Sequence, residues 1–261
     1  MKTVIVPIDF SDTSLHAAKY AAQLLTGHYG VTMILYHSCD KKSEMAEAEK
    51  LLQEFKVKLR EKFIVVIDTL VQHEEDFIIG LERAVRHRNA DLVIMGITGR
   101  SAIAQTLIGS NTLKFAETKT CPVLIIQEHS EFREIKNVML ASDFQDTYKT
   151  TPSGPIKDFL KNFRPQFHVV NVDSEHYIAL TDSYEKDKQD LIKMFDGFNP
   201  SFYFLRMFDV DEALNLFAEE KNIDLIISIQ KNQSFREKLF KRSHTKSLSY
   251  QSNVPILVVH E

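Results

Sequence analysis

A glycine-bearing stretch between two apolar runs contains the residue types best suited to binding phosphate. Gly96 and Gly99 follow the apolar run Leu92–Met95, and Gly109 stands immediately before Ser110. Residues without a Cβ let backbone N–H groups close around phosphate oxygens. Ser110 is a favourable N-cap, and the helix that it opens would direct unpaired N–H groups and a positive dipole end at an anion. We therefore expect a nucleotide phosphate site here; the alternative is a glycine turn and a capped helix without a ligand.

An aspartate follows the first apolar run of the chain. Pro7 ends the run Thr3–Ile8, and Asp9 comes next, where a parallel strand would deliver it to the carboxyl edge of the sheet. Its carboxylate suits a ribose hydroxyl or an adenine amino group better than a phosphate. The alternative is that Asp9 only orders the following turn, while Ser11 or Asp12 caps the next helix.

Two histidines stand where a metal ligand is conceivable. His37 follows the second apolar run, but it has no partner at metal-binding spacing, so we expect it to pack or hydrogen-bond at the end of that strand. His73 precedes Glu74 at a helix start, where acids complement the helix dipole without any metal. We expect no metal site built from side chains.

The apolar pattern predicts alternating strands and helices, which is typical of a doubly wound, mostly parallel α/β sheet. In the first half we expect strands at Thr3–Ile8, Val31–Tyr36, Phe63–Val71, Asp91–Met95 and Val123–Ile126, and helices at Ser14–Leu25, Ser43–Lys62, Phe77–His87 and from Ser110. The loop after the fourth strand and Asp9 after the first would then face each other across one sheet edge.

The pattern starts again at Glu134, so we expect two tandem five-stranded domains, 1–129 and 134–261. Asp143 and Phe144 repeat Asp9 and Phe10, and Pro255 repeats Pro122 with an offset of 133 residues. The second half is expected to hold strands from Val138 and at Phe167–Val172, Ser201–Leu205, Ile223–Ser228 and Ile256–Val259, with a helix at Val210–Glu220.

The second half lacks the glycines. The offset places Ile229, Asn232 and Arg242 where the first half has Gly96, Gly99 and Gly109, and only Ser110 keeps its counterpart, Ser243. Such a loop should not let a triphosphate approach the backbone, so we predict that the second domain does not bind ATP in this mode. Because Asp143 persists without the glycines, the aspartate has a structural task in both halves. The segment Thr151–Pro155 interrupts the first helical region, with Pro155 as a plausible first helical position.

A basic run lies where the second half lost its glycines. Its members are Lys231, Arg236, Lys238, Lys241, Arg242 and Lys246. We interpret it as a solvated loop, with an anion site or a patch for an acidic partner as the alternatives.

Composition narrows the class of protein. The chain has 261 residues, a formal net charge of −4 and two cysteines, Cys39 and Cys121. The negative charge argues against a general nucleic-acid binder, and two cysteines make neither a disulfide framework nor a zinc site. Cys121 precedes a buried strand and is expected to be a small core residue. Neither a signal peptide nor a membrane span is indicated, so we expect a cytoplasmic protein.

The spacing Gly96-x2-Gly99-x9-Gly109-Ser110, followed by Cys121-Pro122-Val123, resembles the ATP-binding pattern of the universal stress protein family. The resemblance implies a Rossmann-like, adenine nucleotide α-hydrolase-like fold and a site for ATP, or for ADP or AMP. Magnesium would accompany a bound triphosphate. The matching aspartate contributes to the adenosine pocket in this family, and Ser38 falls at an adenine contact where a bulkier apolar residue is commoner. The residues expected to form the site are Pro7, Asp9, Ser38, Met95, Gly96, Gly99, Arg100, Gly109, Ser110, Asn111 and Thr112.

The resemblance also implies partners. Family members pair their last strands, so Val123–Ile126 and Ile256–Val259 are expected to join the two repeats as an internal pseudo-dimer; a homodimer is also open. Such pairing would cover an exposed strand edge. A regulatory protein partner is expected but not identified, and neither nucleic acid nor a membrane is expected as a partner.

Three functions follow from these features. The first is a stress-response or regulatory protein whose nucleotide occupancy changes its associations. The second is an ATP-consuming enzyme of the α-hydrolase type, but no glycine follows the first strand and no base is clearly placed, so we expect weak ATP hydrolysis at most. Arg100 and Thr112 could contact phosphate in either case. The third is an interaction protein without a nucleotide. A phosphoacceptor receiver domain requires an aspartate at the end of its third strand. Asp68 lies inside the third predicted strand, so this class of protein is excluded.

Overall fold

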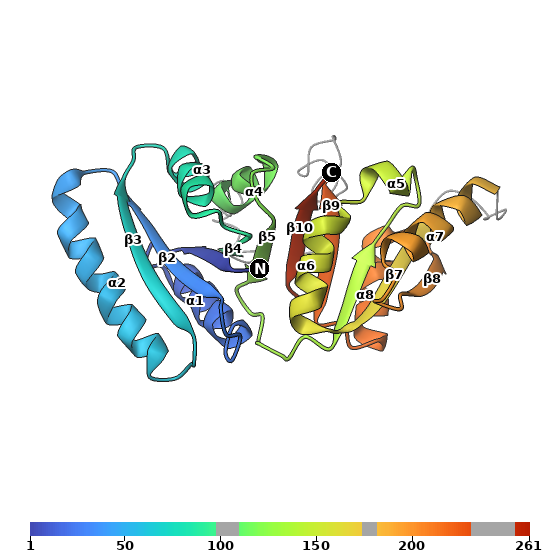
Figure 1. The fold of residues 1–261 in the computed structure, drawn as a ribbon, viewed down its shortest axis with the longest axis horizontal. Coiled ribbons are helices and arrows are strands. Elements are labelled where there is room, and N and C mark those ends of the chain that lie inside the picture. The colour runs from blue at the N-terminus through green and yellow to red at the C-terminus, as the bar shows by residue number, and fades with distance from the viewer. Residues whose placement is uncertain (98–109, 174–181, 231–253) are drawn as a thin grey trace. The chain divides into compact units, whose positions relative to one another are not determined.

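The computed structural model describes residues 1–97, 110–173, 182–230 and 254–261 (Figure 1). The chain divides into two compact units, Met1–Phe132 and Arg133–Glu261. Within the described residues, no helix is both long and apolar enough to span a bilayer.

The first unit is built on a parallel five-stranded sheet. Its spatial order is β3-β2-β1-β4-β5, and every neighbouring pair runs parallel. The strands are β1 (Thr3–Pro7), β2 (Thr32–Cys39), β3 (Val66–His73), β4 (Leu92–Ile97) and β5 (Val123–Gln127). Nearly every residue of β1, β4 and β5 is buried, as expected for strands that are covered on both faces.

Helices cover both faces of this sheet, because right-handed crossovers run in opposite directions from β1. The helices are α1 (Asp12–Leu24), the short 3₁₀ turn η1 (Lys42–Glu44), α2 (Met45–Arg60), α3 (Phe77–Arg88) and α4 (Ser110–Glu117). Figure 1 shows α3 and α4 together on one side of the strands and α1 and α2 on the other.

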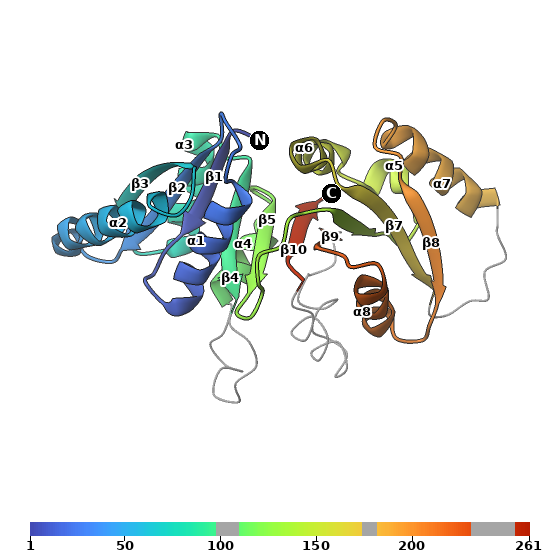
Figure 2. The ribbon, with the colours of Figure 1, turned by 90° about the horizontal axis from the view of Figure 1, so that it is seen from below.

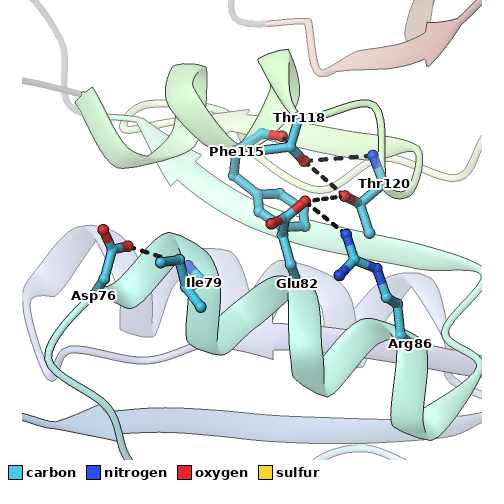
Figure 3. Close-up of polar contacts among 7 residues, drawn as sticks. All are labelled: Asp76, Ile79, Glu82, Arg86, Phe115, Thr118 and Thr120. Atoms are coloured by element: carbon cyan, nitrogen blue, oxygen red, sulfur yellow. Dashed lines mark hydrogen bonds and ion pairs between the residues drawn. The ribbon is translucent and has the colours of Figure 1, made fainter.

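Polar contacts are made at the N-terminus and in the middle of α3 (Figure 3). Asp76 caps the helix by accepting from the N–H groups of Ile78 and Ile79 at 2.8 and 3.1 Å. Further along, the Glu82 carboxylate accepts from Thr120, just before β5, and pairs with Arg86 at 3.2 Å. The helix therefore holds the segment between α4 and β5 against the sheet.

The second unit repeats the architecture. Its order is β8-β7-β6-β9-β10, the same succession as in the first unit, again with parallel neighbours. The strands are β6 (Asn137–Ala141), β7 (Gln166–Asp173), β8 (Ser201–Arg206), β9 (Leu225–Gln230) and β10 (Ile256–His260), and the helices are α5 (Thr147–Thr150), α6 (Ser153–Phe163), α7 (Asp182–Met194) and α8 (Val210–Glu220). Figure 2 shows α5, α6 and α7 on one side of these strands and α8 on the other. The predicted fold class, two doubly wound parallel sheets, is confirmed.

Equivalent residues make equivalent contacts in the two units. Asp91, before β4, accepts from the N–H groups of Lys2 and Thr3 at 2.6 and 2.9 Å. Asp224, before β9, accepts from those of Lys136 and Asn137, both at 2.9 Å. Each carboxylate ties the start of the first strand to the loop before the fourth, so the repeat extends to individual hydrogen bonds.

Cys121 is a buried core residue, as predicted. Its Sγ lies 3.4 Å from the Ala90 carbonyl oxygen, and burial raises the pKa of its thiol to about 12. A thiol with this pKa stays protonated at physiological pH and is unreactive.

β5 and β10 are the strands whose pairing was predicted to join the repeats. That pairing concerns the placement of one unit on the other, and it stays a prediction.

Candidate functional site

Asp9 orders the turn between β1 and α1. Its Oδ1 accepts from the Ser11 N–H at 3.0 Å and from the Ser11 hydroxyl at 2.6 Å, and Ser11 in turn caps α1 by accepting from the Ser14 N–H at 3.2 Å. The turn that Asp9 was expected to order, with Ser11 as the cap, is therefore confirmed, and a nucleotide contact by Asp9 stays a prediction.

The same contacts set the charge of this side chain. Burial raises the pKa of Asp9, but the hydrogen bonds from Ser11 and Ser14 outweigh it, and the pKa lies below the ordinary value of 3.8. Asp9 is therefore a carboxylate at neutral pH and can only accept hydrogen bonds.

This depressed pKa predicts an acid-sensitive contribution to stability. The carboxylate stabilises the folded state fully above about pH 4 and loses that contribution as the pH falls through the lower folded-state pKa. We expect Asp9→Asn to make the acid limb of the melting temperature against pH shallower in thermal unfolding followed by circular dichroism. Asp40→Asn, at an exposed position, is the control and should keep the wild-type profile; an unchanged limb in Asp9→Asn would contradict the assignment.

Phe10 and His37 pack against each other next to the Asp9 turn. Phe10 has a positive φ of 63°, an unusual conformation for a bulky residue, and its ring lies 5.0 Å from that of His37. His37 donates from Nδ1 to the Ile8 carbonyl at 2.6 Å. The predicted role of His37, packing and hydrogen bonding at the strand end, is confirmed.

Gly96 lies where β4 meets the first turn of α1. A Cβ built on Gly96 would stand 2.7 Å from both the backbone oxygen and the Cγ2 of Thr13. Contacts this short with backbone cannot be relieved by a side-chain rotation, so the close approach of α1 requires glycine here. Sequence reasoning assigned the missing Cβ to a phosphate; in the structure the space belongs to Thr13.

Thr112 joins the two described ends of the glycine loop. Its hydroxyl is buried and donates to the Gly96 carbonyl at 2.8 Å, and α4 begins at Ser110. The end of β4 and the first turn of α4 thus lie together at the carboxyl edge of the sheet. Because the hydroxyl proton is donated to Gly96, Thr112 could donate to a phosphate only by giving up that hydrogen bond, and its phosphate contact stays a prediction. Gly99, Arg100 and Gly109 lie outside the described residues.

The other predicted site residues lie around the same edge. Pro7 is buried at the end of β1, opposite Tyr36 of β2. Met95 is a buried residue of β4, and Asn111 is exposed in the first turn of α4. Ser38 donates to the Glu74 carbonyl at 3.2 Å, so it closes the end of β2 onto the segment before α3.

The second unit keeps the aspartate turn but not its surroundings. Asp143 accepts from the Gln145 N–H at 3.3 Å, and Phe144 again has a positive φ, of 51°. The structural task predicted for this aspartate in both halves is confirmed. Ile229 occupies the Gly96 position, and the single helix α1 is replaced by short α5 and then α6, which begins at Ser153, two residues before Pro155. Asn232, Arg242, Ser243 and the basic run lie outside the described residues.

Comparison with known proteins identifies the first unit. The model of the universal stress protein family matches residues 1–127, nearly the whole of that unit. By this match, residues 1–127 are similar to the universal stress protein family. A universal stress protein of Methanocaldococcus jannaschii is 24% identical over 151 residues, which cover 49% of this chain and 82% of that protein.

Solved universal stress proteins share the fold of both units. The structure of one from Archaeoglobus fulgidus DSM 4304 is 17% identical, covers 99% of this chain and 96% of its own, and superposes with a TM-score of 0.73. A second structure, described as a putative universal stress protein from Pseudomonas aeruginosa UCBPP-PA14, is 12% identical, covers 100% and 93% of the two chains, and has a TM-score of 0.62. At these identities the likeness concerns the fold.

Proposed function

We propose that the universal stress protein domain binds an adenine nucleotide, ATP with Mg²⁺, and that its occupancy regulates what the protein associates with in a stress response. The observation that carries this proposal is the hydrogen bond from Thr112 to Gly96, which joins the first turn of α4 to the end of β4 at the carboxyl edge of the sheet, the edge at which Asp9 follows β1. Ligands of open α/β sheets bind at this edge.

The described residues fit both the nucleoside part and the phosphate part of such a ligand. Asp9 is ionised, so its carboxylate can accept from a ribose hydroxyl or the adenine amino group. The first turn of α4 presents backbone N–H groups and a positive dipole end to phosphate. Magnesium would be held mainly by phosphate oxygens and water.

The second domain is proposed to bind no nucleotide in this mode. The Ile229 side chain stands near the end of β9, where the first unit has Gly96 in β4. In addition, α5 ends at Thr150 after a single turn, whereas α1, its counterpart in the first unit, extends from Asp12 to Leu24. A regulatory function therefore rests on one nucleotide in the chain, with the second domain free to serve another ligand or partner.

The nucleotide content of the purified protein tests this proposal. We expect mass spectrometry of the small molecules released on denaturation to find close to one adenine nucleotide per chain, or titration with Mg·ATP to saturate at that ratio. Two nucleotides per chain would contradict the assignment of the second domain. If neither method finds a bound nucleotide, the proposal is wrong, and the protein is an interaction protein that has the glycine loop but binds no nucleotide.

A further inference from the structure

The segment that leads out of the first unit, residues 128–132, is held on α1 by two side-chain contacts. The Nε2 atom of His16 lies 2.9 Å from the carbonyl oxygen of Ser130. Because a carbonyl oxygen only accepts, Nε2 carries the ring proton and donates it. One turn further along α1, the rings of Tyr20 and Phe132 meet edge to face, with their centroids 5.3 Å apart. The second unit begins at the next residue.

Ser130 is also tied to the end of β5. Its N–H donates to the carbonyl oxygen of Gln127 at 3.0 Å, and its hydroxyl donates to the Oε1 atom of the same residue at 2.8 Å. Ser130 is fully buried. A segment that connects two domains ordinarily runs through solvent, with few contacts to either of them. This connection instead turns inward and docks on α1.

The first turn of the same helix forms one side of the proposed nucleotide site. The Asp9 N–H donates to the Ser14 hydroxyl at 3.3 Å, and the Ser11 hydroxyl donates to the Asp9 carboxylate at 2.6 Å. Thr13 fills the space beside Gly96 of β4. The start of α1 is therefore fixed by the two strands that bear the proposed site, β1 and β4.

These two sets of contacts lie close together along α1. Thr13 and His16 are three residues apart, which is less than one helical turn. The helix is hydrogen-bonded from its beginning, where the Leu15 N–H donates to the Ser11 carbonyl at 3.0 Å. A change in the position of its first turn therefore moves the His16 side chain with it. The contacts also define two states of residues 128–132, docked on α1 as in the structure, and released.

We propose that α1 couples nucleotide occupancy of the first domain to the connection between the domains. A bound nucleotide holds the first turn of α1 and so favours the docked state of residues 128–132, with His16 as the positioning residue that transmits the effect. This coupling rests on the proposed function and supplies its regulatory step. Because coupling between two sites is reciprocal, docking of the connection also raises the affinity for the nucleotide.

Hydrogen exchange of the full chain, followed by mass spectrometry of peptides that cover residues 128–132, tests the proposal. Saturating Mg·ATP should slow exchange of this segment in the wild type by about fivefold, the lower end of typical coupling. In His16→Ala the segment should exchange faster without nucleotide, and Mg·ATP should no longer slow it. Calorimetric titration should show about fivefold weaker binding of Mg·ATP to this variant, although His16 is outside the proposed nucleotide site.

Two further variants separate transmission from a merely structural role. His16→Gln keeps an N–H donor and should restore both the protection by Mg·ATP and the affinity. Lys19→Ala, at an exposed position of α1, is the matched control and should behave like the wild type. If His16 only stabilised the fold, His16→Ala would melt at a lower temperature but would keep the wild-type ratio of exchange rates with and without Mg·ATP.

A second pair of variants tests the coupling without a nucleotide. Gly96→Ala pushes α1 away from β4, so it should speed exchange of residues 128–132. The same substitution added to His16→Ala should change the exchange little, because the connection is already released. A general loss of stability would instead speed exchange equally in both backgrounds.

Two results would overturn the coupling and leave the proposed function standing. They are unchanged exchange of residues 128–132 when Mg·ATP binds the wild type, and additive effects of Gly96→Ala and His16→Ala. Absence of Mg·ATP binding to the wild type would contradict the proposed function and, with it, the nucleotide dependence of the docking. The Gly96→Ala pair would then still decide whether α1 transmits to the connection, so the two failures are distinguishable.

Discussion

Gly109→Val is expected to abolish binding of Mg·ATP while the protein stays folded. The residue precedes Ser110, where α4 begins, and the proposed phosphate site lies at this helix start. A β-branched side chain would keep phosphate oxygens from the backbone N–H groups. A hydrogen bond to a charged group contributes about 1.5–3 kcal/mol, so losing two of them should weaken binding by about 100-fold or more.

Calorimetric titration with Mg·ATP measures the effect, and thermal unfolding checks that the fold survives. Asn232→Val is the matched control, because Asn232 falls at the Gly99 position of the second repeat, which is proposed to bind no nucleotide. Its affinity should equal that of the wild type. Wild-type affinity in Gly109→Val would remove the glycine loop from the proposed site.

Gly96→Ala is expected to destabilise the first unit. The added Cβ would lie 2.7 Å from the Thr13 backbone oxygen, and relief requires α1 to move away from β4. Overpacking of this kind costs about 1–3 kcal/mol, which corresponds to a fall in melting temperature of roughly 3–10 °C for a unit of this size. Because α1 follows the Asp9 turn directly, nucleotide affinity should fall as well.

Gly154→Ala provides the control for Gly96→Ala. Gly154 lies in α6, and a Cβ there would meet no atom within 4 Å. Replacing an unstrained helical glycine with alanine should raise stability, by up to about 1 kcal/mol. Differential scanning calorimetry of both variants measures the contrast. A wild-type melting temperature in Gly96→Ala would mean that α1 and β4 are not packed as closely as described.

The local pattern of the sequence was sufficient to predict the architecture. Apolar runs of strand length, separated by helical periods, predicted both parallel sheets, and α8 has the predicted bounds, Val210–Glu220. The repeat was visible because Asp143 and Phe144 restate Asp9 and Phe10. These features depend on residue type and spacing within one segment, and short-range backbone and burial preferences decide them.

The tertiary structure decided what several of those residues contact. Gly96 packs against Thr13, and the Thr112 hydroxyl donates to Gly96, although both had been assigned to phosphate from their place in the motif. In the second unit, a cavity is lined in part by Val170 of β7 and Val210 of α8, which lie on different elements. No spacing rule links such positions, because strand register and helix docking bring them together. The sequence thus determined which sheet edge bears the proposed nucleotide site. The packing of distant segments determined that Thr13 fills the space next to Gly96 and that a cavity stays open in the second unit.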